Sequence, residues 1–351
     1  THHASSAASD VYKRQLLNDL KNGSINLLIG THAIFEQNVI FNNLGYAVID
    51  EQHRFGVKQR SKIWEKNNPP PHVLIMTATP IPRTLTMSLY GDLDLSIIDE
   101  LPPGRKDVIT VHRKDKNRLK VFGFIRDQIK QGRQIYIVYP LIEESKKMDL
   151  KYLEDGLESI TREFDKENYS IGVMHGRMRS SNKDIEMNNF LNGKIDILIS
   201  TTVIEVGVNV PNASVMIIEN AERFGLSQLH QLRGRVGRGK YDSYCVLMTN
   251  DKISEDAKIR IDAMVNSNDG FKISEVDLRL RGPGDVLGTK QSGVLDFKIA
   301  DILEDESILF SVSNEADLLI KKDPKLNLNE NYNIRSFILN NPINKSWNEI
   351  G

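Results

Sequence analysis

The sequence has almost no cysteine and no long run of apolar residues. Its single cysteine, Cys245, can form neither an intrachain disulfide nor a multi-cysteine metal site, which is typical of a reducing compartment such as the cytoplasm. No apolar run approaches the roughly 20 residues that span a bilayer, and the N-terminus lacks the basic and then apolar order of a signal peptide. We therefore expect a cytoplasmic protein that does not enter a membrane.

An excess of charge of one sign is also missing. The chain carries 46 Lys and Arg against 47 Asp and Glu, a net charge of -1. The bulk charge therefore does not indicate a polyanionic partner, and a site for one would have to be local. With 351 residues, 40% of them apolar and 26% charged, the composition is that of a packed, soluble protein of two or three domains.

Short apolar runs rich in β-branched residues alternate with helix-length polar stretches along much of the chain. Runs of this length, bounded by turns, are typical of parallel strands that are covered on both faces, so we expect an α/β fold. The predicted strands are residues 25–29, 46–49, 73–76, 135–139, 195–199, 215–218 and 244–248.

Several helix ends are marked by capping residues. A helix is predicted over residues 181–192, where Ser181 can cap the N-terminus and Gly193 follows as a stop. After residue 248, Ser254 and Ser274 are predicted to open the two helices of a hairpin, on either side of a turn at residues 268–270.

The domain organisation follows from composition. Residues 99–106 contain adjacent prolines, which remove two backbone donors and fix φ, so we place a domain boundary there. The small, polar and aperiodic residues 1–15 have the character of a leader or an artefact. The predicted organisation is therefore a leader or artefact at 1–15, the C-terminal part of a first domain at 16–105, a second domain at 106–250, and a hairpin with a tail at 251–351.

Two adjacent acids, Asp50 and Glu51, directly follow the predicted strand at residues 46–49. Open α/β sheets bind ligands at this carboxyl edge. In nucleoside triphosphatases the first acid of such a pair holds Mg²⁺, usually through water, and the second orients or deprotonates the attacking water. An isolated pair of acids more often only caps the next helix, so the rest of the sequence has to decide between these readings.

A basic segment with regular glycines lies at residues 223–240, which include five Lys or Arg and no acid. The glycines at 234, 237 and 239 would let the backbone come close to a ligand. If the segment is helical, Arg235 and Arg238 lie on one face and both can reach one γ-phosphate. A solvated surface is the usual alternative for a charge run, but the glycine spacing favours an anion site.

Together with other segments, these residues resemble the superfamily two helicases and, within them, the RecG family of branched-DNA helicases. Near the C-terminus, residues 268–271 and 279–293 resemble the translocation motif that this family shares with the transcription-repair coupling factor. The segments that match motifs Ib, II, III, V and VI are Gly30-Thr31-His32, Asp50-Glu51-Gln52-His53, Thr77-Ala78-Thr79-Pro80, residues 201–207 and residues 231–238.

This resemblance implies RecA-like parallel-sheet motor domains, the first one partial, followed by a C-terminal helical hairpin and tail. It also implies roles for single residues. Catalysis would fall to Asp50, Glu51, His53, Gln231, Arg235 and Arg238, with Mg²⁺ held by Asp50 through water. ATP would be contacted by Asp50, Glu51, Gly207, Arg235 and Arg238, DNA by Thr31, His32 and Thr202, and coupling would involve Thr77, Thr79, Arg279, Arg281 and Gln291.

The resemblance further implies ATP and Mg²⁺ as cofactors, branched double-stranded DNA such as forks and Holliday junctions as substrate, a single-strand-binding protein as a partner, a bacterial source and a monomer. Two departures stand out. Asn209 lies where many superfamily members carry Asp, and the Gly-x-x-x-x-Gly-Lys-[Ser/Thr] loop that cradles phosphates is absent from the sequence. We therefore expect a helicase fragment that by itself does not hydrolyse ATP.

Two alternatives stay open at this point. One is a non-enzymatic DNA-binding module, because the chain keeps the DNA-facing segments without the phosphate loop. The other is the transcription-repair coupling factor, which would also need a module that binds RNA polymerase. The sequences Asp-Glu-Gln-His at residues 50–53 and His-Gly-Arg-Met at residues 175–178 favour the RecG family over that factor.

Overall fold

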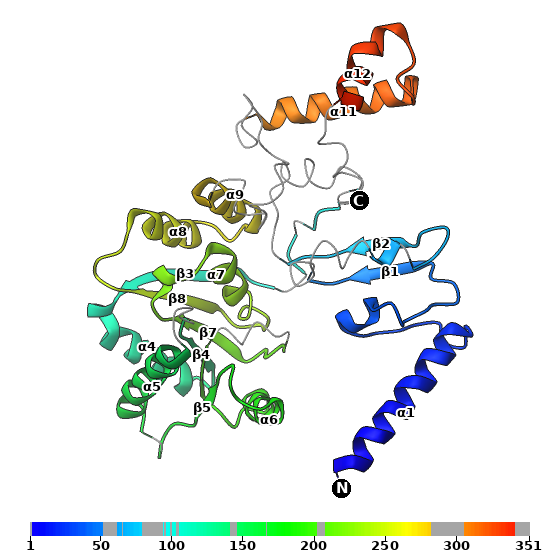
Figure 1. Cartoon of the computed structure of the whole chain (residues 1–351). Helices are drawn as coiled ribbons and strands as arrows, with labels where there is room; N and C mark the ends of the chain where they lie inside the picture. The colour runs from blue at the N-terminus through cyan, green and yellow to red at the C-terminus, as the bar shows by residue number, and fades with distance from the viewer. Residues whose placement is uncertain are drawn as a thin grey trace. The chain divides into compact units, whose positions relative to one another are not determined.

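The computed structural model describes residues 2–51, 62–64, 66–78, 94, 96–98, 100–102, 105–140, 146–165, 167–201, 208–281 and 305–340. The chain forms two compact units, residues 79–306 and residues 1–78 with 307–351, which are considered one at a time (Figure 1). Five of the candidate residues, His53, Thr79, Thr202, Gly207 and Gln291, lie outside the described residues, as do the side chains of His32 and Arg281.

The larger unit is built on a six-stranded sheet in which all neighbouring strands are parallel (Figure 1). The strand order is β3-β8-β7-β4-β6-β5. Strands β4, β6 and β7 are buried at every position, which is why they appear in the sequence as unbroken apolar runs. The strands are β3 (Val108–Lys114), β4 (Gln134–Val138), β5 (Ile171–Met174), β6 (Ile197–Ser200), β7 (Ala213–Ile218) and β8 (Ser243–Thr249).

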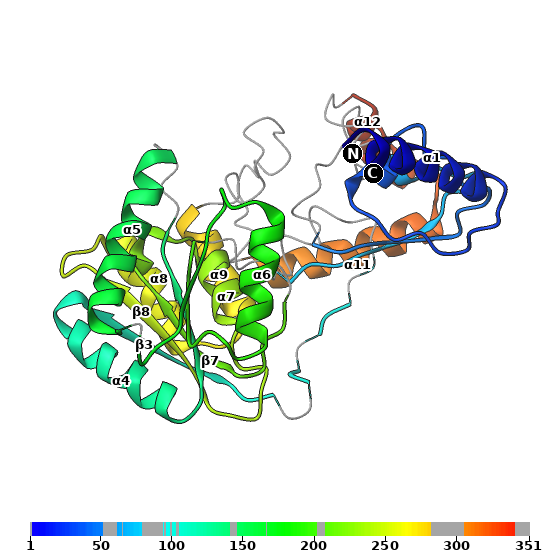
Figure 2. The same ribbon diagram turned by 90° about the horizontal axis from the view of Figure 1, so that it is seen from below.

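Helices cover both faces of this sheet (Figures 1 and 2). One apolar core joins the sheet to α4 (Arg118–Lys130) and α5 (Lys146–Glu163). A second core joins the other face to α6 (Ser180–Leu191), α7 (Leu226–Arg233), α8 (Glu255–Asn266) and α9 (Gly270–Arg281). Short 3-10 turns, η3 (Asp115–Asn117) and η5 (Ala221–Arg223), precede α4 and α7.

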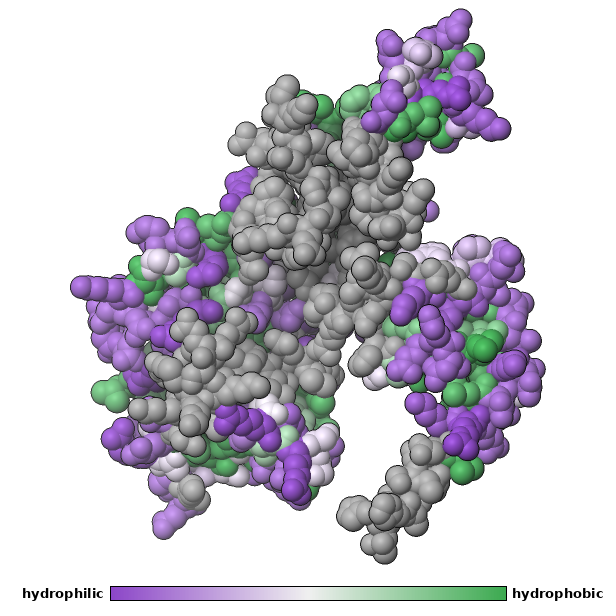
Figure 3. Space-filling model, in the orientation of Figure 1, coloured by the Kyte–Doolittle hydropathy of each residue, from purple (hydrophilic) through white to green (hydrophobic). Residues whose placement is uncertain are grey.

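The smaller unit contains a parallel pair of strands, β1 (Tyr46–Ile49) and β2 (His72–Ile75), with α1 (His2–Lys21) and η1 (His32–Phe35). A C-terminal helical segment follows with α11 (Glu306–Lys322), η6 (Asn329–Asn331) and α12 (Tyr332–Asn340). Apolar side chains lie on the surface of this segment (Figure 3), among them Ile308, Val312, Phe337 and Leu339. Within the described residues, no helix combines the length and the apolar character needed to cross a bilayer.

The structure confirms six of the seven predicted strands, with ends that differ by one or two residues. The seventh is wrong: residues 25–29 form no strand, and Leu27 and Ile29 are 77% and 86% exposed. Strands β3 and β5 were not predicted, because Arg, Lys and His interrupt the first and Gly172 the second. Helix α1 was not predicted either, and it runs through residues that the composition assigned to a leader.

The predicted helices are present, but two of their expected caps are wrong. Helix α6 begins at Ser180 without a side-chain cap, whereas Gly193, at φ 72°, does end it as expected. Ser254 caps α8 as predicted and accepts a hydrogen bond from the amide of Ala257. Ser274 instead lies inside α9, where its hydroxyl donates to the carbonyl oxygen of Phe271 at 2.8 Å.

Alanine substitution at two glycines of the larger unit should change the free energy of unfolding in opposite directions. A Cβ at Gly239 would lie 2.2 Å from the carbonyl oxygen of Pro211, whereas a Cβ at Gly123 in α4 meets no atom within 4 Å. We expect Gly239→Ala to lower the free energy of unfolding by about 2 kcal/mol, because backbone must move. We expect Gly123→Ala to raise it by roughly 0.5–1 kcal/mol through helix propensity. Urea denaturation of both variants measures the two signs, and equal effects would contradict this packing.

Candidate functional site

The two acids lie at the carboxyl end of β1, as predicted. Asp50 is exposed, and its Oδ1 accepts a hydrogen bond from the amide of Glu51 at 2.9 Å. Glu51 has φ 53°, in the left-handed region that costs a non-glycine residue about 1–2 kcal/mol. Strained residues of this kind cluster at functional sites, so the backbone itself supports a role for this pair.

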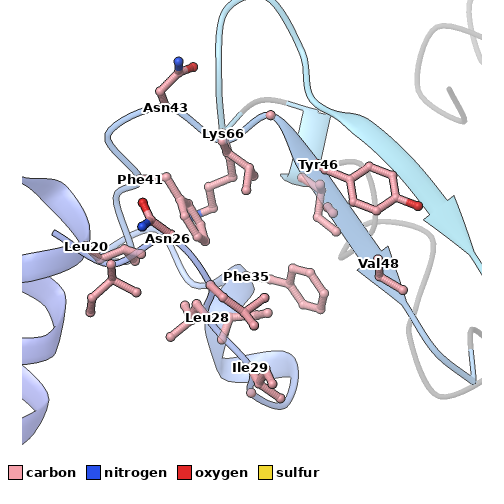
Figure 4. A pocket seen from close by; sticks show the side chains of 18 of the residues that line it. Leu20, Asn26, Leu28, Ile29, Phe35, Phe41, Asn43, Tyr46, Val48 and Lys66 are labelled. Carbon is pink, nitrogen blue, oxygen red and sulfur yellow. The ribbon is translucent and has the colours of Figure 1, made fainter. Parts of the chain in front are cut away.

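Thr31 and Asp50 line one cavity of about 760 Å³ within the smaller unit. Thr31 precedes η1 and accepts the amide hydrogen of Ile34 on its carbonyl oxygen at 3.1 Å. Lys66 lines the same cavity (Figure 4) and donates from Nζ to the carbonyl oxygens of Glu36 and Val39, at 2.6 and 2.8 Å. Burial lowers the pKa of Lys66, and the charge of the nearby Lys62 lowers it further.

The donor set at the end of β1 suits Mg²⁺ better than a transition metal. Among the described residues, no group of three or more His, Cys, Asp or Glu side chains is arranged to hold a metal ion. Mg²⁺ does not need such a group, because it keeps several waters and binds proteins through one or two carboxylates together with phosphates. The exposed carboxylate of Asp50 fits that requirement.

The basic segment of the larger unit is not helical where its two arginines lie. Helix α7 ends at Arg233, and Gly237 has φ 81°. The helical condition under which Arg235 and Arg238 would share one face is therefore not met. Arg238 is exposed, and its Nε donates to the carbonyl oxygen of Gly234 at 3.1 Å. Burial lowers its pKa, as do the positive charges of Arg235 and Arg105.

The glycines of this segment approach protein and not an open ligand site. A Cβ at Gly237 would lie 2.8 Å from Cγ2 of Val108, and one at Gly239 would lie 2.2 Å from the carbonyl oxygen of Pro211. The sequence suggested that these glycines let the backbone reach a ligand. The structure shows instead that they let this segment pack against the start of β3 and the residues before β7.

Arg233, which the sequence left without a role, is the most heavily bonded arginine of the site. Its side chain is buried, and Nη1 donates to the carbonyl oxygens of Ser267 and Met264 at 2.7 and 2.9 Å. Longer contacts of 3.4 Å reach the Asn268 carbonyl oxygen and Oγ1 of Thr110. Carbonyls at the end of α8 are orphan acceptors, so Arg233 fastens the α8–α9 turn to α7.

His230 is fixed in one tautomer by the same arginine. Nη2 of Arg233 lies 3.1 Å from Nδ1 of His230. Arginine can only donate, so Nδ1 accepts and the ring hydrogen is on Nε2. Burial lowers the pKa of His230 to about 4, and the positive charges of Arg233 and Arg105 act in the same direction against Asp269. His230 is therefore neutral at physiological pH.

A second link ties the hairpin to the carboxyl edge of the sheet. Arg260 of α8 donates from Nη2 to the carbonyl oxygen of Glu222 in η5 at 2.9 Å. The Glu222 carboxylate accepts from Nδ2 of Asn250, just after β8, at 2.6 Å. The sequence gave no sign of this link beyond the isolated charges, because the three residues come from separate elements.

A basic loop follows β5 at the same carboxyl edge. Arg177 and Arg179 are exposed, and Lys183 donates to the Gly176 carbonyl oxygen at 3.0 Å. The loop leads into α6, whose first turn carries no acid. Thr201, at the end of β6, is attached to β5 through a hydrogen bond from its amide to the carbonyl oxygen of Met174. This edge can therefore attract an anion.

The remaining candidates are spread out. Gln231 is half-buried on α7, Arg279 is exposed on α9, and Thr77 is exposed just beyond β2. The structure thus brings Thr31 and Asp50 together in one unit, and Gln231, Arg235 and Arg238 together on one segment of the other.

Three family models match successive parts of the chain. The DEAD/DEAH box helicase model matches residues 2–88, the helicase conserved C-terminal domain matches residues 117–240, and the model of ATP-dependent DNA helicase RecG, domain 3, C-terminal, matches residues 267–341. With the parallel sheets, these matches define the class of protein: the chain has the RecA-like α/β architecture of helicase motor domains, followed by C-terminal helices.

The similar proteins identify the family within this class. The chain is 51% identical over 323 residues to ATP-dependent DNA helicase RecG of Synechocystis sp., covering 92% of this chain and 38% of that protein. It is 48% identical over 311 residues to RecG of Bacillus subtilis, covering 89% and 45%. A structure of RecG bound to a three-way DNA junction aligns with a TM-score of 0.64 at 45% identity, over 85% of this chain and 38% of that one. The chain belongs to the RecG family, matches the C-terminal portion of its members and spans less than half their length.

The contacts of Arg233 predict a large stability effect. Arg233→Met removes the donor to the buried carbonyl oxygen of Met264 and to the partly buried one of Ser267, so we expect the free energy of unfolding to fall by about 3 kcal/mol. Arg113→Met is the matched control, because Arg113 is exposed and bonds only the carbonyl oxygen of the neighbouring His112. Urea denaturation compares the two, and a loss below about 1 kcal/mol for Arg233→Met would show that these bonds add little.

The pKa of His230 predicts how stability depends on pH. The unfolded chain takes up a proton near pH 6.5, whereas the folded ring does so only near pH 4, so acid stabilises the unfolded state. We expect His230 to remove about 1 kcal/mol of stability between pH 7 and pH 5.5. Denaturation curves at both pH values should show a smaller drop for His230→Gln than for the unchanged chain. An identical drop would contradict the neutral, buried state of His230.

Proposed function

We propose that this chain is part of an ATP-driven helicase that moves on double-stranded DNA and remodels forks and Holliday junctions in recombination and repair. The observation that carries the proposal is the presence in one RecG-family sequence of an Asp-Glu pair after β1, in which Asp50 is exposed and Glu51 half-buried, and of the arginine segment after α7. The junction-bound RecG structure supports branched DNA as the substrate. A single-strand-binding protein as partner, and a monomeric state, belong to the same proposal.

In this proposal the nucleotide is bound by a phosphate loop that is absent from the present sequence. Asp50 would hold Mg²⁺, and Glu51 and His53 would orient the water that attacks the γ-phosphate. Gln231, Arg235 and Arg238 act on the phosphates, and Gly207 allows close backbone approach to the nucleotide. Bound Mg²⁺ supplies charge neutralisation on the β- and γ-phosphates.

Glu51 is suited to this task by its backbone. The left-handed conformation at φ 53° turns the chain sharply after the strand, and the Asp50 carboxylate holds the turn through the Glu51 amide. A fixed carboxylate is a better guide for an attacking water than a mobile one, because less ordering is needed in the transition state. Arg238, held by the Gly234 carbonyl oxygen, is pre-oriented in the same sense.

DNA contacts in this proposal involve the phosphodiester backbone. Thr31, His32 and Thr202 supply hydroxyl, imidazole and backbone donors that position phosphates without reading sequence. The exposed Arg177 and Arg179 support this assignment, because they add positive charge beside β6, the strand that leads to Thr202. Such contacts carry no base specificity and suit a motor that moves along any duplex.

The coupling residues complete the proposal. Thr77 and Thr79 connect the nucleotide site with the DNA path, and Arg279, Arg281 and Gln291 transmit motor closure to the loop after α9. The domain boundaries at residues 15, 105 and 250 belong to the same proposal. The contacts of Arg233 support the connection, since they attach the hairpin directly to the segment that carries Arg235 and Arg238, and Arg260 attaches it to η5, which precedes α7.

Hydrolysis should depend on both motor domains. In a fusion of this chain to the upstream portion of the Bacillus subtilis relative, we expect Glu51→Gln and Arg238→Ala to lower ATP turnover on the order of 10³-fold or more. Junction binding should remain, because neither residue is assigned to DNA. Steady-state ATPase assays and junction titrations on the same preparations measure both effects.

The unfused chain is the control for this experiment, and we expect no ATP hydrolysis from it because its sequence lacks the phosphate loop. Turnover by the chain alone would contradict the assignment of the site. Fork unwinding by the fusion would exclude the non-enzymatic DNA-binding module. A variant that retains near wild-type turnover would remove its residue from the mechanism.

Substitution of the residues proposed to couple ATP hydrolysis to DNA movement should affect the three activities differently. In the same fusion we expect Arg281→Ala and Gln291→Ala to keep ATPase and junction binding but to lose fork unwinding, because a hinge transmits motion only through specific contacts. Arg113→Ala is the control and should keep all three activities. Parallel loss of all three would indicate misfolding, and wild-type unwinding would exclude these residues from coupling.

A further inference from the structure

Arg105, from the proline-rich segment before β3, reaches the same atom as Arg238. Its Nη2 donates to the carbonyl oxygen of Gly234 at 3.4 Å, and Nε of Arg238 donates to that oxygen at 3.1 Å. A carbonyl oxygen has two lone pairs and can accept both. Two guanidinium groups that are 133 residues apart in sequence therefore converge on one backbone atom.

Two further contacts hold the segment of Arg105 in this place. Gly237 has no side chain, and a Cβ there would lie 2.8 Å from Val108 and 3.5 Å from the carbonyl oxygen of Lys106. Lys106 forms an ion pair of 2.7 Å with Asp242, on the far side of the glycine segment. Arg105 is thus positioned by its neighbours in sequence, and its place beside Arg238 does not depend on one weak hydrogen bond.

The charges at this point are unbalanced. Within the described part of the chain, neither Arg105 nor Arg238 forms an ion pair with a carboxylate. Burial lowers the pKa of Arg238, and the nearby positive charges of Arg235 and Arg105 lower it further. Since no carboxylate pairs with either guanidinium group in the described part of the chain, the like charges of Arg105 and Arg238 repel each other, and an anion with several charged oxygens relieves that repulsion.

We propose that Arg105 is a third arginine of the surface by which Arg235 and Arg238 bind phosphates. The inference rests on the proposed function, which assigns only the two arginines after α7 to the nucleotide, and it adds a ligand from the segment before β3. The ligand class is a polyphosphate anion, here the phosphate chain of a nucleoside triphosphate. A bound polyphosphate would then help to hold residues 105–108 in place, because Arg105 connects the ligand to the start of β3.

A purely structural role is the competing explanation. A basic side chain near the carbonyl groups at the end of a helix is stabilising by itself, and Gly234 is the residue that caps α7. Only one of the two roles depends on the positive charge of Arg105. A capping residue needs only a donor, which glutamine also supplies, whereas an anion ligand needs the positive charge.

Binding of inorganic tripolyphosphate to this chain, followed by isothermal titration calorimetry at low salt, separates the two roles. We expect Arg105→Gln to weaken binding about tenfold, since a charged hydrogen bond contributes about 1.4 kcal/mol. Arg105→Lys should weaken it less. Arg238→Ala is the positive control. Arg113→Ala is the negative control, because Arg113 is an exposed arginine at the opposite end of β3.

The outcomes distinguish this inference from the function on which it rests. Loss of affinity with both Arg105→Gln and Arg238→Ala, at unchanged melting temperatures and with Arg113→Ala unaffected, supports the third arginine. Loss with Arg238→Ala alone overturns it and leaves the proposed function in place. If neither variant loses affinity, the segment after α7 is not a phosphate site, and both proposals fail. If Arg105→Ala is unfolded while Arg105→Gln is folded and binds normally, Arg105 has only the capping role.

Discussion

Burial of a parallel sheet on both faces is the constraint on which the rest of the larger unit depends. Strands β4, β6 and β7 have no exposed position, so each loop that joins them to a helix is forced to one of the two sheet edges. The basic loop after β5, Thr201 after β6 and Glu222 after β7 are gathered at one edge for this reason. The sheet thus brings polar and charged residues from distant parts of the sequence to one edge.

Buried polar side chains fix the position of α8 and α9 against α7, which the apolar core alone does not determine. Apolar packing is not directional and would tolerate small shifts of α8 and α9 against α7. The guanidinium group of Arg233, with acceptors at the end of α8, permits one position only. Asp277 of α9, which lies 3.4 Å from the hydroxyl of Ser227, adds a second directional contact between the same helices. The hairpin of α8 and α9 and the arginine segment are therefore held in a fixed position relative to each other.

Those features of the fold that depend on a local sequence pattern could be predicted from the sequence. The fully buried strands and the acids after β1 were found because continuous apolar runs and their ends are visible without the fold. Strand β3 was not found, since an edge strand with one solvated side carries His112, Arg113 and Lys114 and has no apolar run. Residues 25–29 have the pattern of a strand, but pairing requires a partner in register, which no local pattern encodes.

Among the site residues, prediction depended on how a residue acts. Asp50, Glu51 and Arg238 could be proposed as site residues from the sequence, because ligand chemistry requires their residue types at a set spacing. Arg233, Arg260 and Arg105 were not identified, because their partners are backbone carbonyl oxygens. Every residue has a carbonyl, so the partners leave no signature in the sequence. Whether Arg235 and Arg238 lie on a helix could not be decided from the sequence; α7 ends at Arg233, and Gly237 takes a left-handed conformation that no helix allows.

The glycines of the arginine segment have a consequence for reading related sequences. Gly237 and Gly239 are confined by Val108 and by the carbonyl oxygen of Pro211, both parts of the scaffold, and not by a nucleotide. A homologue that had lost hydrolysis would still need both glycines to fold. Their retention is therefore no sign of an active enzyme, and a comparison of homologues would have to turn to the residues proposed to contact phosphate, Arg235 and Arg238, to tell a working motor from a pseudoenzyme with the same architecture.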